Sequence, residues 1–163
     1  ITDQSQRAPM SFMVMTTRRG VIRLRLRPDA APVTTEYIKK CIGSRLYDGR
    51  CFYRSDFVIQ CGLHGSNVGN PHGNLPVNET ASHVKISNIR GTAAIAHWDV
   101  PDCGNTEFFI NLKTNAHLDT AYGGYCVFAT VDEGDAASFS TIDAIAQAVA
   151  AGEKTVIESV TVE

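Results

Sequence analysis

A single arginine, Arg54, stands among aromatic and apolar residues in the first half of the chain. It closes the aromatic run 51–54 and is followed by the apolar run 57–59. A guanidinium is planar and permanently charged, so beside an apolar surface it can act as a fixed electrostatic group without any nucleophile. Strand periodicity places Phe108 and Phe109 on opposite faces, so one of them must point away from the core, and a peptide groove would explain an exposed phenylalanine. Spacing alone favours a simpler interpretation, in which Arg54 is a surface arginine on a strand.

Conventional catalytic motifs are missing from the sequence. No HExxH or paired Cys/His spacing occurs, so we expect no metal site. Neither G-x-S-x-G nor a P-loop is present, which leaves hydrolase and nucleotide chemistry without a basis. A cysteine nucleophile stays open, although Cys51, Cys61 and Cys126 lie inside predicted strands, where buried inert thiols are commoner. The histidines that could serve such a cysteine are His64, His72, His83, His97 and His117.

The composition is that of one ordinary globular domain. Of the 163 residues 44% are hydrophobic and 20% charged, and the formal net charge is −2. These values indicate neither a nucleic-acid surface nor an acidic tail. Arginine alternates with aliphatic residues over residues 21–27, which is typical of a half-buried strand with its charged face in water. No apolar run approaches the length of a membrane span.

The cysteines indicate the cellular compartment, and residues 1–9 indicate where the folded domain begins. The five cysteines are odd in number and form no CxxC, so we expect a reducing, cytoplasmic compartment. Residues 1–9 are polar and lack periodicity, and we expect a disordered extension or an expression remnant there, with Met10 as the native start. We expect residues 10–163 to form a single domain and the protein to be a monomer.

Short β-rich runs and two isolated helices make up the expected elements. Glycine in the turn before residue 21 predicts a hairpin of the first two strands. The apolar stripe of the first helix begins at Val33 and the helix ends at Gly43. Many short strands without βαβ alternation favour a closed antiparallel barrel with helical lids. The predicted strands are 12–17, 21–27, 51–54, 57–61, 92–96, 107–111, 126–131 and 155–162, and the helices are 33–42 and 140–150.

Five motifs follow one another along the chain. Residues 52–54 and 57–62 read F-Y-R and F-V-I-Q-C-G, and residues 91–96 read G-T-A-A-I-A. Residues 107–111 and 124–128 read E-F-F-I-N and G-Y-C-V-F. This succession resembles the cyclophilin family of peptidyl-prolyl isomerases, particularly its bacterial-type branch. Each motif alone is weak, but five in register are specific, and the resemblance spans nearly the whole chain.

The resemblance implies a mainly β fold, a closed eight-stranded antiparallel β-barrel capped by two α-helices, with a shallow groove on its outside. It implies that Arg54 is the catalytic arginine and that Gln60 hydrogen-bonds the substrate backbone. Ala96 and His97 would meet the peptide as an added strand segment. The implied substrate-binding residues are Phe57, Val58, Ala96, His97, Glu107, Phe109, His117, Leu118 and Tyr125.

The chemistry implied by the resemblance is rotation about X-Pro peptide bonds. The barrier to this rotation is roughly 18–20 kcal/mol because nitrogen shares its lone pair with the carbonyl. In the twisted transition state the proline nitrogen recovers that lone pair, which a fixed guanidinium can meet there but not in the planar ground state. This is differential binding, and it needs neither nucleophile nor cofactor.

Several residues differ from the family's pattern. Glu107 replaces a glutamine, and its carboxylate could compete for the donors of Arg54 or orient the guanidinium. His117 replaces a large aromatic residue, which weakens one pocket wall and implies weak cyclosporin binding. The turn 55–56 is shorter than the family's and could displace Arg54. Trp98 replaces a small residue at the groove and could narrow it.

The resemblance therefore implies a peptidyl-prolyl cis-trans isomerase that assists folding of proline-containing peptides and protein clients. Two alternatives stay open. One is a catalytically weak or inactive cyclophilin-fold module that binds proline segments as a scaffold. The other is a barrel that uses the long loop 62–74 for protein partners, since loops of that length are uncommon and often functional.

Overall fold

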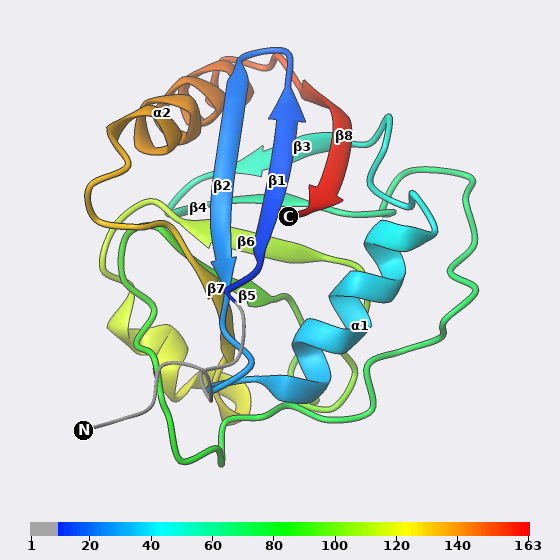
Figure 1. The fold of residues 1–163 in the computed structure, drawn as a ribbon, viewed down its shortest axis with the longest axis vertical. Helices are drawn as coiled ribbons and strands as arrows, with labels where there is room; N and C mark the ends of the chain where they lie inside the picture. Colours follow the sequence, from blue (N-terminus) through cyan, green and yellow to red (C-terminus); the bar gives the residue numbers. More distant parts are fainter. Residues whose placement is uncertain (1–9) are drawn as a thin grey trace.

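The strands close into an antiparallel barrel with two helices, which confirms the fold that the resemblance implied. The computed structural model describes residues 10–163, and the prediction for residues 1–9 lies outside this range. Around the barrel the strands follow the order β1-β2-β7-β5-β6-β4-β3-β8 (Figure 1). Their bounds are β1 Phe12–Thr17, β2 Gly20–Leu26, β3 Cys51–Ser55, β4 Val58–Cys61, β5 Thr92–Ile95, β6 Phe108–Asn111, β7 Val127–Thr130 and β8 Thr155–Val162.

The β1–β2 hairpin shows how the sequence pattern shapes the barrel. Gly20 pairs with Thr17 at the turn and has a φ of 132°, a conformation that glycine adopts without a steric penalty. Ile22 and Leu24 are fully buried in the barrel, whereas the intervening Arg23 lies partly in solvent. The alternation of arginine and aliphatic residues is therefore the two-faced strand that was predicted.

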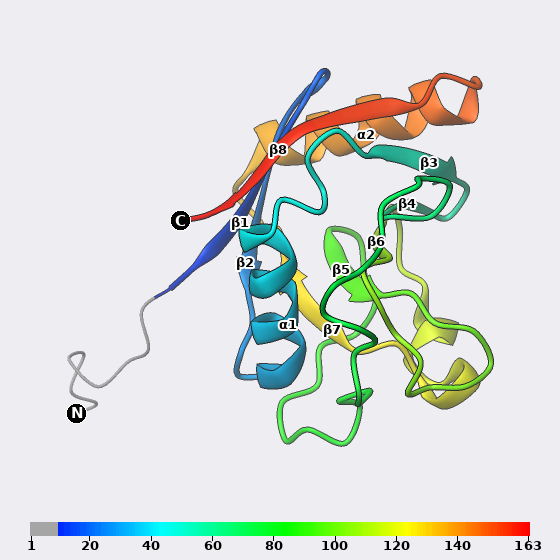
Figure 2. The same ribbon diagram turned by 90° about the vertical axis from the view of Figure 1, so that its right-hand side faces the viewer.

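The two helices, α1 (Pro32–Gly43) and α2 (Ala136–Ala150), lie at opposite ends of the barrel in both views (Figures 1 and 2). The prediction that Val33 belongs to the buried stripe of α1 is wrong. Val33 is 45% exposed, and the residues that the first turn of the helix buries are Thr34 and Thr35 instead. The second helix begins four residues earlier than predicted, at 136 instead of 140, because Asp135 caps it by accepting from the Ser138 backbone N–H.

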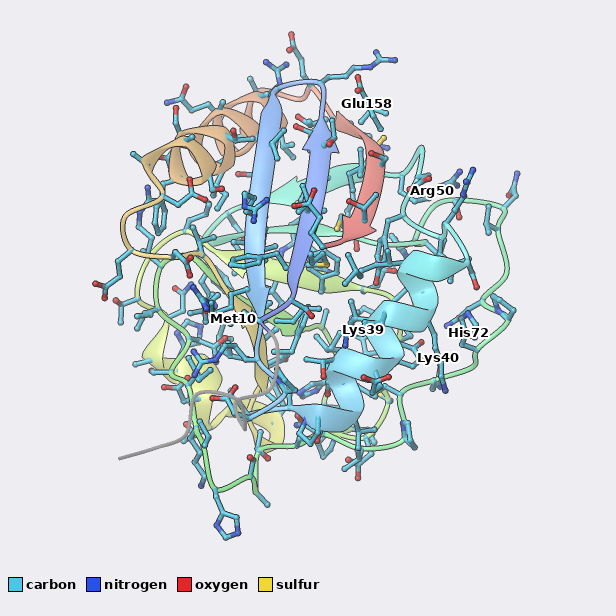
Figure 3. The ribbon with its side chains drawn as sticks, in the orientation of Figure 1. Met10, Lys39, Lys40, Arg50, His72 and Glu158 are labelled. Carbon is cyan, nitrogen blue, oxygen red and sulfur yellow. The ribbon has the colours of Figure 1, made fainter. Side chains whose placement is uncertain are left out.

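A long connection without helix or strand leads from β4 to β5 and passes beside α1 (Figure 2). Tyr37 of α1 donates to the Gly73 carbonyl at 2.7 Å. His72 lies in the same stretch (Figure 3), with its Nε2 2.8 Å from Ser44 Oγ at the end of the helix. Hydrogen bonds thus hold the predicted loop 62–74 against α1. Among residues 10–163 no helix is long and apolar enough to cross a membrane.

Candidate active site

One row of side chains crosses neighbouring strands on the outer face of the barrel. Arg54 of β3 pairs with Gln60 of β4, and Gln60 pairs with Phe109 of β6. Phe109 in turn pairs with Ala94 of β5. Directly opposed residues point to the same side of a sheet. The register therefore gathers a cation, an amide and an aromatic ring on one surface.

An apolar cluster outside the barrel surrounds Phe109. Phe108 and Phe109 point to opposite faces, as predicted, and Phe108 lies fully buried inside the barrel. The expectation of an exposed phenylalanine is wrong, because Phe109 is only 3% exposed. The segment around the 3₁₀ turn Ala116–Asp119 covers it. The buried members of this outer cluster are Val58, Ala94, Phe109, Leu118 and Val127.

A cavity of about 320 Å³ opens between Arg54 and this outer cluster. Of the residues predicted from the sequence, only His117 is not part of its lining. His117 is exposed, and its ring packs edge-on against Phe57 at 5.4 Å. The cavity also has lining residues that were not assigned as site residues, among them Tyr53, His64 and Asn105. The full lining is Tyr53, Arg54, Phe57, Val58, Gln60, His64, Ala96, His97, Trp98, Cys103, Asn105, Glu107, Phe109, Leu118 and Tyr125.

Neighbouring side chains fix the Arg54 guanidinium over the cavity. Its Nε donates to Asp56 Oδ2 at 2.8 Å, and its Nη1 donates to Gln60 Oε1 at 2.9 Å. Its Cζ lies 5.3 Å from the centroid of the Phe57 ring. Asp56 Oδ1 also accepts from the Val58 backbone N–H at 3.1 Å. The short turn therefore holds Arg54 in the cavity lining instead of displacing it, and Nη2 donates to no group among residues 10–163.

Glu107 forms no ion pair or hydrogen bond with Arg54, so the predicted competition for the donors of Arg54 is absent. Its carboxylate accepts from Tyr53 Oη at 2.7 Å and from Thr106 Oγ1 at 3.0 Å. The backbone N–H of His64 lies 3.3 Å from both carboxylate oxygens. Gly62 makes this position available, since a Cβ there would lie 1.9 Å from Glu107 Oε2.

The far wall of the cavity is a stacked pair of rings. His97 and Tyr125 lie 4.0 Å apart at an interplanar angle of 12°. The His97 ring nitrogens face the carbonyl oxygens of Trp98 at 2.6 Å and Gly124 at 2.8 Å. Tyr125 also meets the Phe109 ring edge-on at 5.6 Å. The indole of Trp98 is 82% exposed at the rim, so this wall ends in an aromatic edge.

A buried amide network adjoins the cavity lining at Phe57, and no pattern in the sequence indicates it. Asn111 Nδ2 donates to Asn88 Oδ1 at 3.0 Å, and Asn115 Nδ2 donates to Asn111 Oδ1 at 2.9 Å. Asn115 Nδ2 also donates to the Phe57 carbonyl at 3.1 Å. Buried amides are stable only when paired in this way. The network thus ties the end of β6 to the segment carrying Phe57 and Leu118.

Burial weakens Cys41, Cys61 and Cys126 as nucleophiles. All five cysteines are free, and Cys41 and Cys61 are buried. Burial raises the pKa of Cys41 and of Cys126 to about 11, which keeps both as thiols near neutral pH. Among residues 10–163 no group of three or more His, Cys, Asp or Glu side chains could hold a metal ion.

Comparison with known sequences gives consistent matches. The family model described as "Cyclophilin type peptidyl-prolyl cis-trans isomerase/CLD" matches residues 12–163. Peptidyl-prolyl cis-trans isomerase B of Escherichia coli (strain K12) is 31% identical over 90% of this chain and 96% of its own. A peptidyl-prolyl cis-trans isomerase of Streptomyces antibioticus is 35% identical, over 83% of each chain. Peptidyl-prolyl cis-trans isomerase A of Dickeya dadantii (strain 3937) is 33% identical over 76% of this chain and 67% of its own.

Solved structures share the fold. A cyclophilin-type peptidyl-prolyl cis-trans isomerase of Cryptosporidium parvum superposes with a TM-score of 0.73 at 16% identity, covering 95% of this chain and 98% of its own. A second structure of that protein, determined in the presence of the dipeptide Ala-Pro, gives a TM-score of 0.71 at 16% identity, with coverage of 93% and 98%.

Proposed function

Because the chain belongs to the cyclophilin-type peptidyl-prolyl cis-trans isomerase family, we propose that the cavity beside Arg54 is its active site and that X-Pro peptide bonds rotate there. The single observation that carries this proposal is the outer-face row, which sets a fixed guanidinium beside a buried aromatic notch. The Arg54 side chain is 41% exposed, and Phe109 beneath it is 3% exposed. Arg54 can therefore contact the polar backbone of a peptide while Phe109 contacts the apolar proline ring.

In this proposal the proline ring enters the notch formed by Val58, Phe109 and Leu118. These side chains make an apolar floor, and burial of apolar area drives the ring onto it. Ala96 and His97 offer backbone groups at the far wall for the peptide chain. We propose that a monomer is the active unit and that it acts on proline-containing peptides and protein clients.

Catalysis would follow from the direction of the Arg54 donors. Asp56 and Gln60 already accept from Nε and Nη1, so these contacts fix the guanidinium before substrate arrives. Nη2 is left to approach the proline nitrogen when that nitrogen becomes pyramidal. A donor fixed in advance stabilises the twisted state without reorganising, and each ~1.4 kcal/mol of such preference is about tenfold in rate.

Gln60 would position the substrate and the arginine together. Its Oε1 faces Arg54, and it lies between Arg54 and Phe109 in the row. The amide therefore separates the charged and apolar parts of the site. Glu107, Tyr125 and His117 would act as wall or support.

A second candidate is a scaffold that binds proline segments without turnover. It is favoured by one observation: two of the donor positions of Arg54 are already occupied by Asp56 and Gln60. In this reading the guanidinium is structural and the notch alone grips the ligand.

An exchange measurement separates the two candidates. Two-dimensional NMR of an Ala-Pro-containing peptide should show cis/trans exchange far above the uncatalysed rate with the wild-type protein. Arg54→Ala should remove most of the enhancement, whereas Arg23→Ala, an arginine on the outer face of β2 paired with Glu163, should leave it unchanged. Peptide binding with no exchange enhancement by wild type would contradict the enzyme proposal and support the scaffold.

A further inference from the structure

A β-bulge brings two β3 side chains onto the same β4 residue. Phe52 pairs with Cys61, but the next pair along is Arg54 with Gln60, so the register shifts at Tyr53. Tyr53 is the extra residue, and Tyr53 and Arg54 together oppose Gln60. Bulges of this kind re-aim a side chain, and they occur often beside active sites. Both residues therefore reach the Gln60 amide from the same face of the barrel.

Hydrogen bonds form a continuous chain from Glu107 to Arg54. Tyr53 Oη donates to Glu107 Oε1 at 2.7 Å, and Gln60 Nε2 donates to Tyr53 Oη at 3.0 Å. Arg54 Nη1 then donates to Gln60 Oε1 at 2.9 Å. Each link lies within the normal range for a hydrogen bond, so the four side chains act as one unit.

The chemistry of the two ends fixes every donor direction in this chain. A guanidinium can only donate, and an ionised carboxylate can only accept. The Tyr53 hydroxyl must therefore donate to Glu107, which leaves its oxygen to accept from Gln60. The Gln60 amide then has one orientation, with Nε2 toward Tyr53 and Oε1 toward Arg54. Burial, assisted by the neighbouring Glu107, raises the pKa of Tyr53 and keeps the hydroxyl protonated.

The carboxylate end of the chain is itself held. Thr106 Oγ1 and the His64 backbone N–H both donate to Glu107. Thr106 is 2% exposed, so one anchor lies within the protein. Gly62 leaves the room that the carboxylate occupies, because any side chain there would overlap it. Within the described part of the chain Glu107 forms no ion pair, and its hydrogen-bond donors are Tyr53, Thr106 and the His64 backbone N–H.

We propose that Tyr53 and Glu107 are positioning residues that set the orientation of the Gln60 amide and, through it, hold the Arg54 guanidinium toward the substrate. This inference rests on the proposed isomerase function for its effect on rate. Its effect on Gln60 is independent of that function. Neither residue needs to touch the proline ring, since each acts through the next group in the chain.

Two variants interrupt this chain of hydrogen bonds, each at a different hydrogen bond. Tyr53→Phe removes the acceptor of Gln60 Nε2 but keeps the ring that packs on His64 at 5.5 Å. Glu107→Gln keeps the shape but adds a donor at the carboxylate position. Its amide could donate to Tyr53, whose hydroxyl would then donate to Gln60 and turn the Gln60 NH₂ group toward Arg54. Tyr122→Phe is the matched control, because Tyr122 is 62% exposed and lies outside the chain of hydrogen bonds.

The test combines peptide exchange kinetics with ¹⁵N NMR of the Gln60 side-chain amide. Loss of one positioning hydrogen bond should lower kcat about fivefold to tenfold in Tyr53→Phe and in Glu107→Gln, with KM within about twofold. The double variant should be no slower than Tyr53→Phe alone, because the two residues form one unit. The nuclear Overhauser contacts between Gln60 NH₂ and the Tyr53 ring should weaken in Glu107→Gln.

Other results would overturn the proposal. Unchanged Gln60 amide signals in both variants would show that the hydrogen bonds from Glu107 and Tyr53 do not orient Gln60. A kcat within twofold of wild type, with only the melting temperature lowered, would show a merely structural role. If the wild-type protein has no isomerase activity, the proposed function fails, and the Gln60 signals alone then decide whether the positioning is real.

Discussion

Two adjacent phenylalanines on opposite faces of β6 offer a matched pair of substitutions. Phe108 lies fully buried in the barrel core, where its ring meets Tyr47 edge-on at 5.4 Å. Phe109 is equally buried, but in the outer cluster that lines the cavity. Phe108→Leu and Phe109→Leu therefore make the same chemical change at nearly the same burial. They differ only in whether the barrel core or the outer cluster loses the aromatic ring.

The expected cost of each change follows from the apolar volume removed. Leucine fills most of the space, so the free energy of unfolding should fall by about 1–2 kcal/mol in both variants. For a chain of this length that corresponds to a melting temperature lower by about 3–6 °C. Loss of ring contact with a bound pyrrolidine should cost about 1 kcal/mol of binding, or roughly fivefold in KM. Only Phe109→Leu should show this second effect.

The assay is urea unfolding of both variants together with peptide exchange kinetics. We expect similar shifts in the urea midpoint and a raised KM in Phe109→Leu alone. If Phe108→Leu raises KM as much as Phe109→Leu, the assignment of the outer face as the proline site is refuted. The same holds if Phe109→Leu binds peptide as tightly as wild type.

Three further predictions concern the support of the site and the stability of the barrel. Gly62→Ala should lower the melting temperature strongly and disturb peptide exchange, because the new methyl group would overlap the Glu107 carboxylate. Hydrogen bonds from Arg25 lower the pKa of Asp132, and this effect outweighs the burial that raises it. The ion pair therefore stabilises the fold fully above the unfolded pKa of Asp132, about 3.9. This stabilisation is lost as the pH falls through the lower pKa of the folded state. Asp132→Asn should therefore lose less stability between about pH 5 and pH 2 than wild type, measured by unfolding at each pH, with an effect of at most about 1 kcal/mol because the pair is half exposed. Asn111→Ala should cost about 2–4 kcal/mol in urea unfolding, since it leaves buried amide partners unpaired.

Controls for these predictions come from the same chain. Gly65→Ala changes a glycine with a φ of 80° and no atom within 4 Å of the added methyl, so it should show only the cost of the backbone conformation. Asp99→Asn removes an exposed carboxylate that has no ion pair within residues 10–163 and should leave the acid dependence unchanged. Asn74→Ala removes an exposed asparagine and should be nearly neutral. Equal effects of variant and control would contradict the physical reason in each case.

Local patterns predicted most of the elements, because burial on one face imposes a period on the sequence. The β1–β2 hairpin is the clearest example, with its glycine turn and alternating aliphatic residues. The start of α2 was missed because its first turn is set by the Asp135 cap, and the apolar period becomes visible only later in the helix. Val33 was misplaced for a similar reason, since periodicity alone does not show which side of a first turn faces the barrel.

The candidate site was predictable only in part. The motifs placed Arg54, Gln60 and Phe109 in one site, and the strand register brings them together on one face. The bulge at Tyr53 and the partners of Glu107 were not predictable, because they depend on how strands distant in sequence meet. A register shift of one residue leaves no mark on the local pattern of β3. The buried asparagine network is hidden for the same reason.

The most direct test of the central claim compares ground-state affinity with catalysed rate in Arg54→Ala. Peptide affinity, measured by titration, should stay within about threefold of wild type, because the notch that holds the proline ring is unchanged and half-exposed charges add little to binding. The catalysed exchange rate should fall about a hundredfold or more, since the lost donor acts on the twisted state. A variant that keeps more than a third of the wild-type rate, or one whose rate falls only in proportion to its affinity, would contradict the claim that Arg54 binds the transition state selectively.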